Sequence, residues 1–156
     1  TRKVLEICGG NGFPSGEIGV ESLSNLGEVV VEAPLYGGCL SVITSLIGSD
    51  YAPPSLRGHV LFFEDIDEPV GRILRNWNQL LYSRTLEGVK GVVLGRFEGL
   101  SEIEHVQVKK EIQRRSGGLP IWTSDDFGHI AANTPLVVGA TCDIEGSILH
   151  WKVEKK

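Results

Sequence analysis

The stretch HVLFFEDIDEPVGRILRNWNQLL (residues 59–81) decides the fold, because it holds a strand and a helix in immediate succession. Residues 60–63 form an uninterrupted apolar run, the pattern of a strand that is covered on both faces. After Pro69, a residue type that often stands at the start of a helix, large apolar side chains recur at helical spacing. The stretch therefore predicts a buried strand followed by an amphipathic helix.

Downstream of this stretch the alternation of strand and helix continues. A second apolar run at residues 90–97 predicts another strand, and residues 101–118 predict a polar helix with a Ser-x-x-Glu start and a Gly-Gly stop. A short strand is predicted at 119–123. This order of elements favours right-handed crossovers between parallel strands. We therefore predict a parallel sheet in the middle of the chain.

The two ends of the chain carry antiparallel signals. Residues 136–156 alternate between apolar and polar side chains around a turn at Gly146, which predicts a terminal hairpin. Upstream, we predict a strand at 3–8, a second strand that Pro34 stops, and a helix that ends at Gly48. The predicted fold class is α/β, with a parallel core and an antiparallel flank.

Composition excludes several classes of function. The chain has 156 residues, enough for one domain, and its net charge of −5 with scattered basic residues argues against a nucleic-acid surface. No apolar stretch approaches the roughly 18 residues of a membrane span, and no signal peptide is visible. The 3 cysteines form no Cys-x-x-Cys pair, and the 4 histidines lie far apart. We expect a cytoplasmic protein without a disulfide framework, metal, cofactor, nucleic acid or membrane partner.

Polar residues follow each of the three central strands. Glu64 ends the first strand, Arg96 and Glu98 end the second, and His129 lies in the loop after the third. Ligands of open α/β sheets bind beyond the carboxyl ends of the parallel strands. We therefore expect these four side chains to meet at one rim of the sheet.

Glu64 and His129 form the sharpest pair on this rim. A carboxylate that accepts the ring N–H of a histidine fixes its tautomer and stabilises the imidazolium, so the histidine can act as a general base. Two simpler interpretations stay open. Glu64 would lie near the start of the next helix, where an acid is favoured by the helix dipole, and His129 would bond to backbone.

Other reactive residue types in the chain have weaker patterns. The acids at positions 65, 67 and 68 are predicted to cap the helix that begins near Pro69. Cys39 is either a reactive thiol near a helix start or a small residue in a tight turn. The adjacent Asp125 and Asp126 are weak evidence for a cation site. The chain contains no Gly-x-Ser-x-Gly elbow, so it offers no convincing nucleophile.

Four segments in the same order resemble the C-terminal domain of the LD-carboxypeptidase family. This family includes the muramoyl-tetrapeptide carboxypeptidases and the microcin C immunity peptidases. The resemblance implies a swivelling β/β/α domain over residues 28–156, with a parallel central sheet, an antiparallel flanking sheet and a helical layer. Residues 1–27 are then a linker remnant or an antiparallel strand region. The four segments are EAPLYGGCLSVITSLIGSDYAP (32–53), HVLFFEDIDEPVGRILRNWNQLL (59–81), GVKGVVLGRFEG (88–99) and LPIWTSDDFGHIAANTPLVVGA (119–140).

The resemblance also implies roles for the rim residues. Family members use a Ser-Glu-His triad, in which the serine sits on a separate N-terminal domain. The family's acid and histidine match Glu64 and His129, although the prolines that usually follow the histidine are absent here. The substrate side of the cleft is expected to include Glu98 and Arg96, together with the glycine pair at positions 37 and 38.

The implied activity is hydrolysis of the L,D-peptide bond of a murein tetrapeptide, which releases the terminal D-alanine. The expected partners are that substrate and an N-terminal nucleophile domain, and the family also suggests a homodimer. The chain has no methionine, even at position 1, so we expect a piece of a longer protein that is inactive alone. Two alternatives stay open: a microcin C-type immunity peptidase domain, and a non-catalytic binding or assembly domain.

Overall fold

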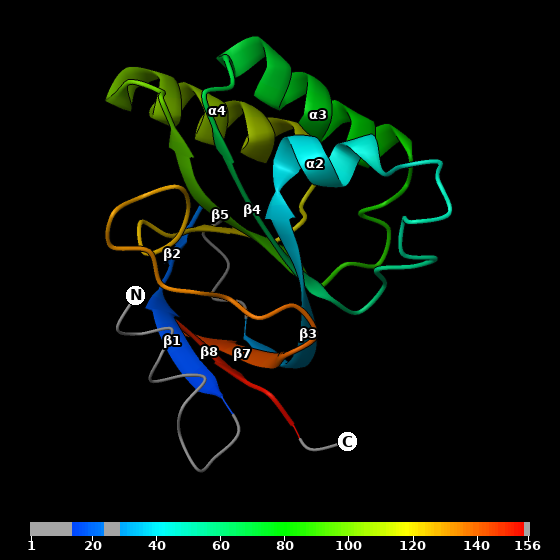
Figure 1. Cartoon of the computed structure of the whole chain (residues 1–156), viewed down its shortest axis with the longest axis vertical. Coiled ribbons are helices and arrows are strands. Elements are labelled where there is room, and N and C mark those ends of the chain that lie inside the picture. The colour runs from blue at the N-terminus through cyan, green and yellow to red at the C-terminus, as the bar shows by residue number, and fades with distance from the viewer. Residues whose placement is uncertain (1–13, 24–28, 155–156) are drawn as a thin grey trace.

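One mixed sheet with helices packed on one face makes up the part of the chain that the structure describes (Figure 1). The structure is a computed structural model, which describes residues 14–23 and 29–154. The sheet order is β1-β8-β7-β3-β4-β5-β6-β2. The helices are α2 (Leu40–Ser45), α3 (Val70–Tyr82) and α4 (Glu102–Arg115). The strands are β1 (Ser15–Gly19), β2 (Glu21–Ser22), β3 (Val30–Cys39), β4 (Val60–Ile66), β5 (Gly91–Glu98), β6 (Ile121–Thr123), β7 (Thr141–Glu145) and β8 (Ile148–Lys152).

The middle of the chain forms the predicted parallel sheet. Strands β3, β4, β5 and β6 pair in parallel, and α3 and α4 connect them across one face (Figure 1). The Ser101–Glu104 capping box that opens α4 is present, with both reciprocal bonds formed. β7 and β8 form the predicted terminal hairpin. The predicted α/β fold, with a parallel core and an antiparallel flank, is therefore confirmed.

Strand β3 corrects the prediction that Pro34 ends a strand, because β3 continues through Pro34 to Cys39. The proline stands where the strand changes partner. Up to Pro34 the strand pairs antiparallel with β7, and from Leu35 onward it pairs in parallel with β4. A residue without an N–H is tolerated where the hydrogen-bond ladder is interrupted. The helix that follows is also shorter than predicted, and ends at Ser45.

Strands β1 and β2 close the sheet on itself. They lie at opposite edges of the sheet, yet only Val20 separates them in the chain. The two edges are therefore drawn together, and we call residues 15–22 the closing strap. The Val20 N–H donates to the Ser147 oxygen at 2.8 Å, beyond the pairing of β1 with β8. The strand predicted at 3–8 lies outside the described residues.

The closure produces two hydrophobic cores, one on each face of the sheet. On the inner face of the closed sheet, strand side chains pack on Trp122, Trp151 and the buried Phe127. On the outer face, α3 and α4 bury Trp77 and Ile112 against the parallel strands. Alternate residues of β4 serve the two cores, as expected from the pleat of a strand. No helix among residues 14–23 and 29–154 is long and apolar enough to span a membrane.

His105 is a buried histidine on the inner side of α4, and neither ring nitrogen has a hydrogen-bond partner in the described structure. Burial lowers its pKa, and the charges of Arg96 and Lys109 lower it further, although Glu102 and Asp125 act in the opposite direction. The folded state therefore binds a proton at His105 less readily than the unfolded chain does.

We expect this histidine to make the fold acid-sensitive below pH 6.5, the ordinary pKa of a histidine. The unfolded state takes up the proton first as the pH falls, so the free energy of unfolding decreases towards the folded-state pKa. His105→Leu should remove this decrease, measured by urea unfolding at pH 7.5 and pH 5.5, whereas His59→Leu should retain it. Glu111 does not add to this effect between pH 7.5 and pH 5.5. Hydrogen bonds from Arg114 and Arg115 lower its pKa to about 2, so its stabilising effect is lost only below pH 4.5. An equal pH dependence in wild type and His105→Leu would contradict this account.

Candidate active site

Glu64 and His129 are in direct contact, although 65 positions separate them in the chain. The His129 Nδ1 lies 2.5 Å from the Glu64 Oε2. A carboxylate oxygen can only accept, so the Nδ1–H donates and Nε2 is left as a proton acceptor. The histidine side chain is 47% exposed and the glutamate 12%. The pair thus presents a half-exposed imidazole whose orientation is fixed by an enclosed acid.

The two adjacent acids of β4 serve opposite faces of the sheet. Glu64 faces the segment that carries His129, whereas Asp65 is buried towards the helices. Asp65 accepts from the Ser41 N–H at 2.8 Å, and so caps α2 from a neighbouring strand. The prediction that Asp65 caps the helix near Pro69 was therefore wrong, and the N-cap residue of that helix, Pro69, makes no side-chain cap bond. Glu64, whose simpler interpretation was an acid favoured by the dipole of the next helix, contacts His129 instead.

Cys39 takes part in the same cap. Its thiol donates to the Asp65 carboxylate at 3.1 Å, and the Ser41 hydroxyl lies 3.2 Å from the sulfur. Burial raises the pKa of Cys39, and the neighbouring carboxylate raises it further. These contacts favour the protonated thiol, and hence the simpler interpretation of Cys39 as a residue of a tight turn.

A β-bulge in β5 stands directly opposite Glu64. Phe63 pairs with Leu94 and Asp65 pairs with Phe97, so two residues of β5, Gly95 and Arg96, face the single Glu64. Bulges next to functional sites re-aim side chains and interrupt strand pairing. The bulge therefore interrupts the pairing of β4 with β5 at the residue that contacts His129.

Phe127 anchors the loop that carries His129, residues 124–134, which we call the His129 segment. Its ring is buried edge-on against Phe62, with ring centres 6.0 Å apart. It fills the space beside Gly95, where a Cβ would lie 2.5 Å from the ring. Because Phe127 is only two residues from His129, its burial places the imidazole near the end of β4.

Further hydrogen bonds hold the same segment. The Gly128 N–H donates to the Asn133 side-chain oxygen at 3.2 Å, and the Thr134 N–H donates to the Asp126 backbone oxygen at 2.7 Å. The Asp126 carboxylate also accepts from the Gly19 N–H of the closing strap at 2.7 Å. From the sequence, Asp126 was only a weak candidate for a cation site, because its partner Gly19 lies on another element. Asn133 was not singled out, although its partner Gly128 lies in the same loop.

A hollow of about 570 Å³ lies beside the imidazole. Its walls are largely apolar, with few polar groups apart from the glutamate and histidine themselves, a composition typical of small-molecule sites. The predicted residue Gly38 lines it, but Gly37, Arg96 and Glu98 do not. Among the described residues, no group of three His, Cys, Asp or Glu side chains could hold a metal ion. The hollow is lined by Gly38, Phe62, Glu64, Ile66, Phe127, Gly128, His129, Ile130, Asn133, Thr134, Pro135 and Leu136.

Arg96 and Glu98 are not paired with each other. The Arg96 guanidinium instead contacts Glu102 at 2.9 Å and Asp125 at 3.3 Å. Glu98 is the exposed last residue of β5, and its backbone oxygen accepts from the Asp67 N–H at 2.9 Å. Of the four substrate-side residues predicted, the structure brings only Gly38 to the hollow, and their roles stay predictions.

Gly37 has a packing role that is independent of any substrate. A Cβ at this position would lie 1.9 Å from the backbone oxygen of Phe62, on the paired strand β4. We expect Gly37→Ala to lower the free energy of unfolding by about 1–3 kcal/mol or more, because strand pairing must open. Gly71→Ala, in α3 with nothing within 4 Å, should raise it by about 0.5–1 kcal/mol. Urea unfolding measures both, and unchanged stability of Gly37→Ala would contradict the close approach.

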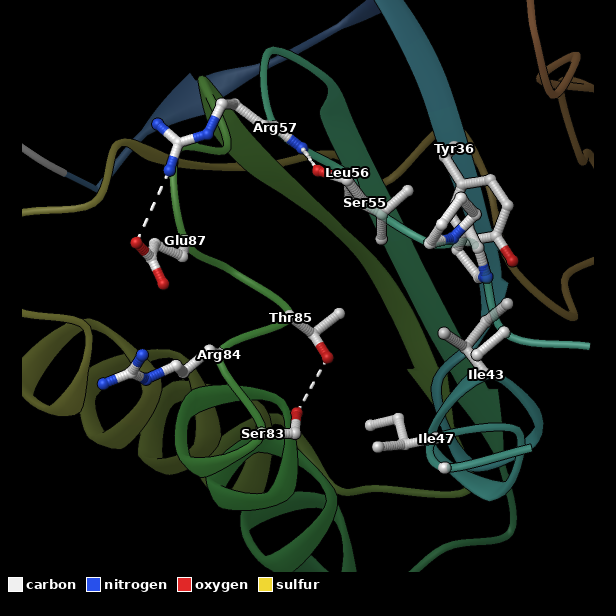
Figure 2. A pocket seen from close by; sticks show the side chains of 14 residues that line it. Tyr36, Ile43, Ile47, Ser55, Leu56, Arg57, Ser83, Arg84, Thr85 and Glu87 are labelled. Atoms are coloured by element: carbon white, nitrogen blue, oxygen red, sulfur yellow. Dashed lines mark hydrogen bonds and ion pairs between the residues drawn. The ribbon is translucent and has the colours of Figure 1, made fainter. Parts of the chain in front are cut away.

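A second hollow, of about 420 Å³, shares no lining residue with the first. Figure 2 shows Tyr36, Ile43 and Ile47 along one side of it, with Ser83 and Thr85 across from them. The Ser83 and Thr85 hydroxyls lie 2.7 Å apart, and an ion pair joins Arg57 to Glu87 at 3.4 Å (Figure 2). None of the predicted site residues lines this second hollow.

Residues 32–144 match the family model described as the LD-carboxypeptidase C-terminal domain, and the chain therefore belongs to this family. The matched region contains both Glu64 and His129. A murein tetrapeptide carboxypeptidase of Pseudomonas aeruginosa is 28% identical over 127 residues, which are 78% of this chain and 40% of that protein. The microcin C7 self-immunity protein of Escherichia coli is 33% identical over 72 residues, which are 46% of this chain and 21% of that protein.

The fold has a solved relative in the crystal structure of muramoyltetrapeptide carboxypeptidase from Oxalobacter formigenes. The TM-score is 0.78 at 25% identity, and the match covers 99% of this chain and 54% of that one. A Streptomyces coelicolor relative is 38% identical over 92 residues, which are 59% of this chain and 29% of that protein. This chain thus spans well under two thirds of the length of its relatives.

Proposed function

We propose that this chain supplies the glutamate and histidine of a Ser-Glu-His triad in an LD-carboxypeptidase. The serine would come from an N-terminal nucleophile domain outside these 156 residues. The observation that carries the proposal is the 2.5 Å contact between Glu64 and His129 at the wall of a hollow. Membership of a peptidase family supports it.

The geometry suits the proton transfers of acyl transfer chemistry. Nε2 of His129 would accept the proton of the serine hydroxyl as the serine oxygen attacks the peptide carbonyl. The imidazolium would then give this proton to the nitrogen of the leaving residue, and water would hydrolyse the acyl-enzyme by the same route. Glu64 would stabilise the imidazolium through its bond to Nδ1. The enclosed position of Glu64 strengthens that electrostatic contribution, because water screens it less.

A murein tetrapeptide is the substrate that we propose. The murein tetrapeptide carboxypeptidase of Pseudomonas aeruginosa matches 78% of this chain, whereas the microcin self-immunity protein matches 46%. Cleavage would release the terminal D-alanine, as in the recycling of murein peptides. The free thiols of Cys39 and Cys142 fit a reducing compartment, so we place this reaction in the cytoplasm.

A peptidase assay on the chain alone and in a joined protein tests the proposal. The joined protein carries the N-terminal serine domain of a family member ahead of this chain. We expect D-alanine release from a murein tetrapeptide by the joined protein only, because the chain alone lacks the nucleophile. The same serine domain joined to its natural C-terminal partner is the positive control.

Three results would contradict the proposal. Hydrolysis by the chain alone that Cys39→Ala abolishes would make the cysteine the nucleophile. No release by the joined protein, while the positive control is active, would favour a non-catalytic binding domain. Cleavage of an aminoacyl sulfamoyl adenosine in place of the tetrapeptide would assign the chain to the microcin-immunity type, since the relative's crystal structure contains such a compound.

A further inference from the structure

We propose that Arg96 is a positioning residue that fixes the His129 segment against β5, and that it does not bind the substrate. The proposal rests on the function proposed above and names the residue on which the geometry of the catalytic pair depends. It replaces the sequence prediction that Arg96 contacts substrate.

The β-bulge makes the backbone of Arg96 available to the His129 segment. At the bulge, Arg96 has no direct partner on β4, and its N–H donates to the Phe127 oxygen at 3.0 Å. Gly128 packs against the same residue, where a Cβ would lie 3.0 Å from the Arg96 oxygen. One residue of β5 thus contacts the two positions that precede His129.

The Arg96 side chain adds a second link to the same segment. Its Nη1 lies 3.3 Å from the Asp125 Oδ1, and its Nη2 lies 2.9 Å from the Glu102 Oε1. The guanidinium side chain is 24% exposed, whereas those of Asp125 and Glu102 are 71% and 79% exposed. Hydrogen bonding to Glu102 raises the pKa of Arg96, and hydrogen bonding to Arg96 lowers that of Glu102. Each terminal nitrogen thus already bonds a protein carboxylate, and these two acids compete with any substrate carboxylate for the guanidinium.

The two ion pairs differ in what they hold. Asp125 belongs to the His129 segment, whereas Glu102 is the first residue of α4. Exposed ion pairs contribute little to stability on their own, so neither pair is needed for the fold. Placement of His129 is far more sensitive, because a misplacement of about 1 Å in a catalytic group can cost about 100-fold in rate. Loss of the Asp125 link should therefore affect catalysis more than stability.

Steady-state kinetics of the joined protein test the role of Arg96. We expect Arg96→Gln and Asp125→Asn each to lower kcat about 10- to 100-fold and to leave KM within about twofold. Glu102→Gln is the matched control, because it removes the other ion pair of the same guanidinium, and it should stay within about twofold of wild type in both constants. A raised KM with unchanged kcat in Arg96→Gln would identify a substrate contact and overturn the proposal.

Nitrogen-15 NMR of the His129 ring in the 156-residue chain gives a readout that needs no activity. The Nδ1–H signal should be shifted by its bond to Glu64, and Glu64→Gln should abolish that shift. Arg96→Gln and Asp125→Asn should reduce the shift, while Glu102→Gln should retain it. Unchanged ring signals in both Arg96→Gln and Asp125→Asn would overturn the positioning role but leave the proposed function intact. Ring signals that do not respond to Glu64→Gln would contradict the proposed function, and this inference with it.

Discussion

Replacing Glu64 by glutamine is expected to lower the rate of D-alanine release by the joined protein about 10⁴-fold. Glutamine has nearly the same size, but it carries no charge to stabilise the imidazolium. Its amide can also place an N–H where the carboxylate accepted from Nδ1, and this favours the wrong tautomer of His129. His129→Ala should lower the rate by about 10⁴-fold or more, because the serine then has no base. Release of D-alanine under single-turnover conditions measures both effects.

His59→Ala is the control for these substitutions, since His59 precedes β4 at the opposite end of the strand from Glu64. It should leave the rate unchanged. The Glu64→Gln and His129→Ala double variant should be little slower than His129→Ala, because the two side chains act as a unit. If Glu64→Gln retained more than about a tenth of the rate, the acid would have no role in orienting the base.

Removal of residues 1–27 is expected to abolish cooperative folding. This deletion takes away the closing strap, with the buried side chains of Ile18 and Val20, and leaves the edges of β8 and β6 without partners. Full burial of one such side chain stabilises by about 1.5–3 kcal/mol, and a whole domain is stable by only about 5–15 kcal/mol. Unpaired strand edges also promote aggregation. Urea unfolding followed by circular dichroism should show no cooperative transition.

Point variants test the buried side chains of the strap without a deletion. Ile18→Ala should cost about 2–5 kcal/mol, because Ile18 is 2% exposed. Val31→Ala, at a residue 58% exposed, should change the free energy of unfolding by no more than about 0.5 kcal/mol. A shortened chain that unfolds at the same urea concentration as the full chain would show that residues 1–27 are a linker remnant.

The rim that holds Glu64 and His129 was predictable from two general rules, although these rules did not separate the pair from Arg96 and Glu98. An apolar run marks the buried strand, and ligand-binding groups gather beyond the carboxyl ends of parallel strands. The capping box of α4 is a local sequence signal, and its prediction is confirmed. In each case the deciding residues are close in sequence, or the topology alone brings them together.

The features that sequence analysis missed depend on contacts between distant elements. The two residues of β2 are too few to show the period of a strand, so closure of the sheet could not be recognised from the sequence pattern. Asp65 caps a helix from a neighbouring strand, which no local motif encodes. The partners of Arg96 lie in α4 and in the loop after β6, and both are set by the tertiary packing.

Because of the pleat of β4, Glu64 and Asp65 face opposite sides of the sheet, and neither acid can take over the contact of the other. A slip of one residue in that strand would present the shorter acid to the imidazole and press the longer one into the cap of α2. Inverting the pair would conserve composition and net charge, yet would disturb both the cap of α2 and the contact with His129. Correct alignment of this strand is thus a condition for the proposed chemistry at this rim, as well as for the fold.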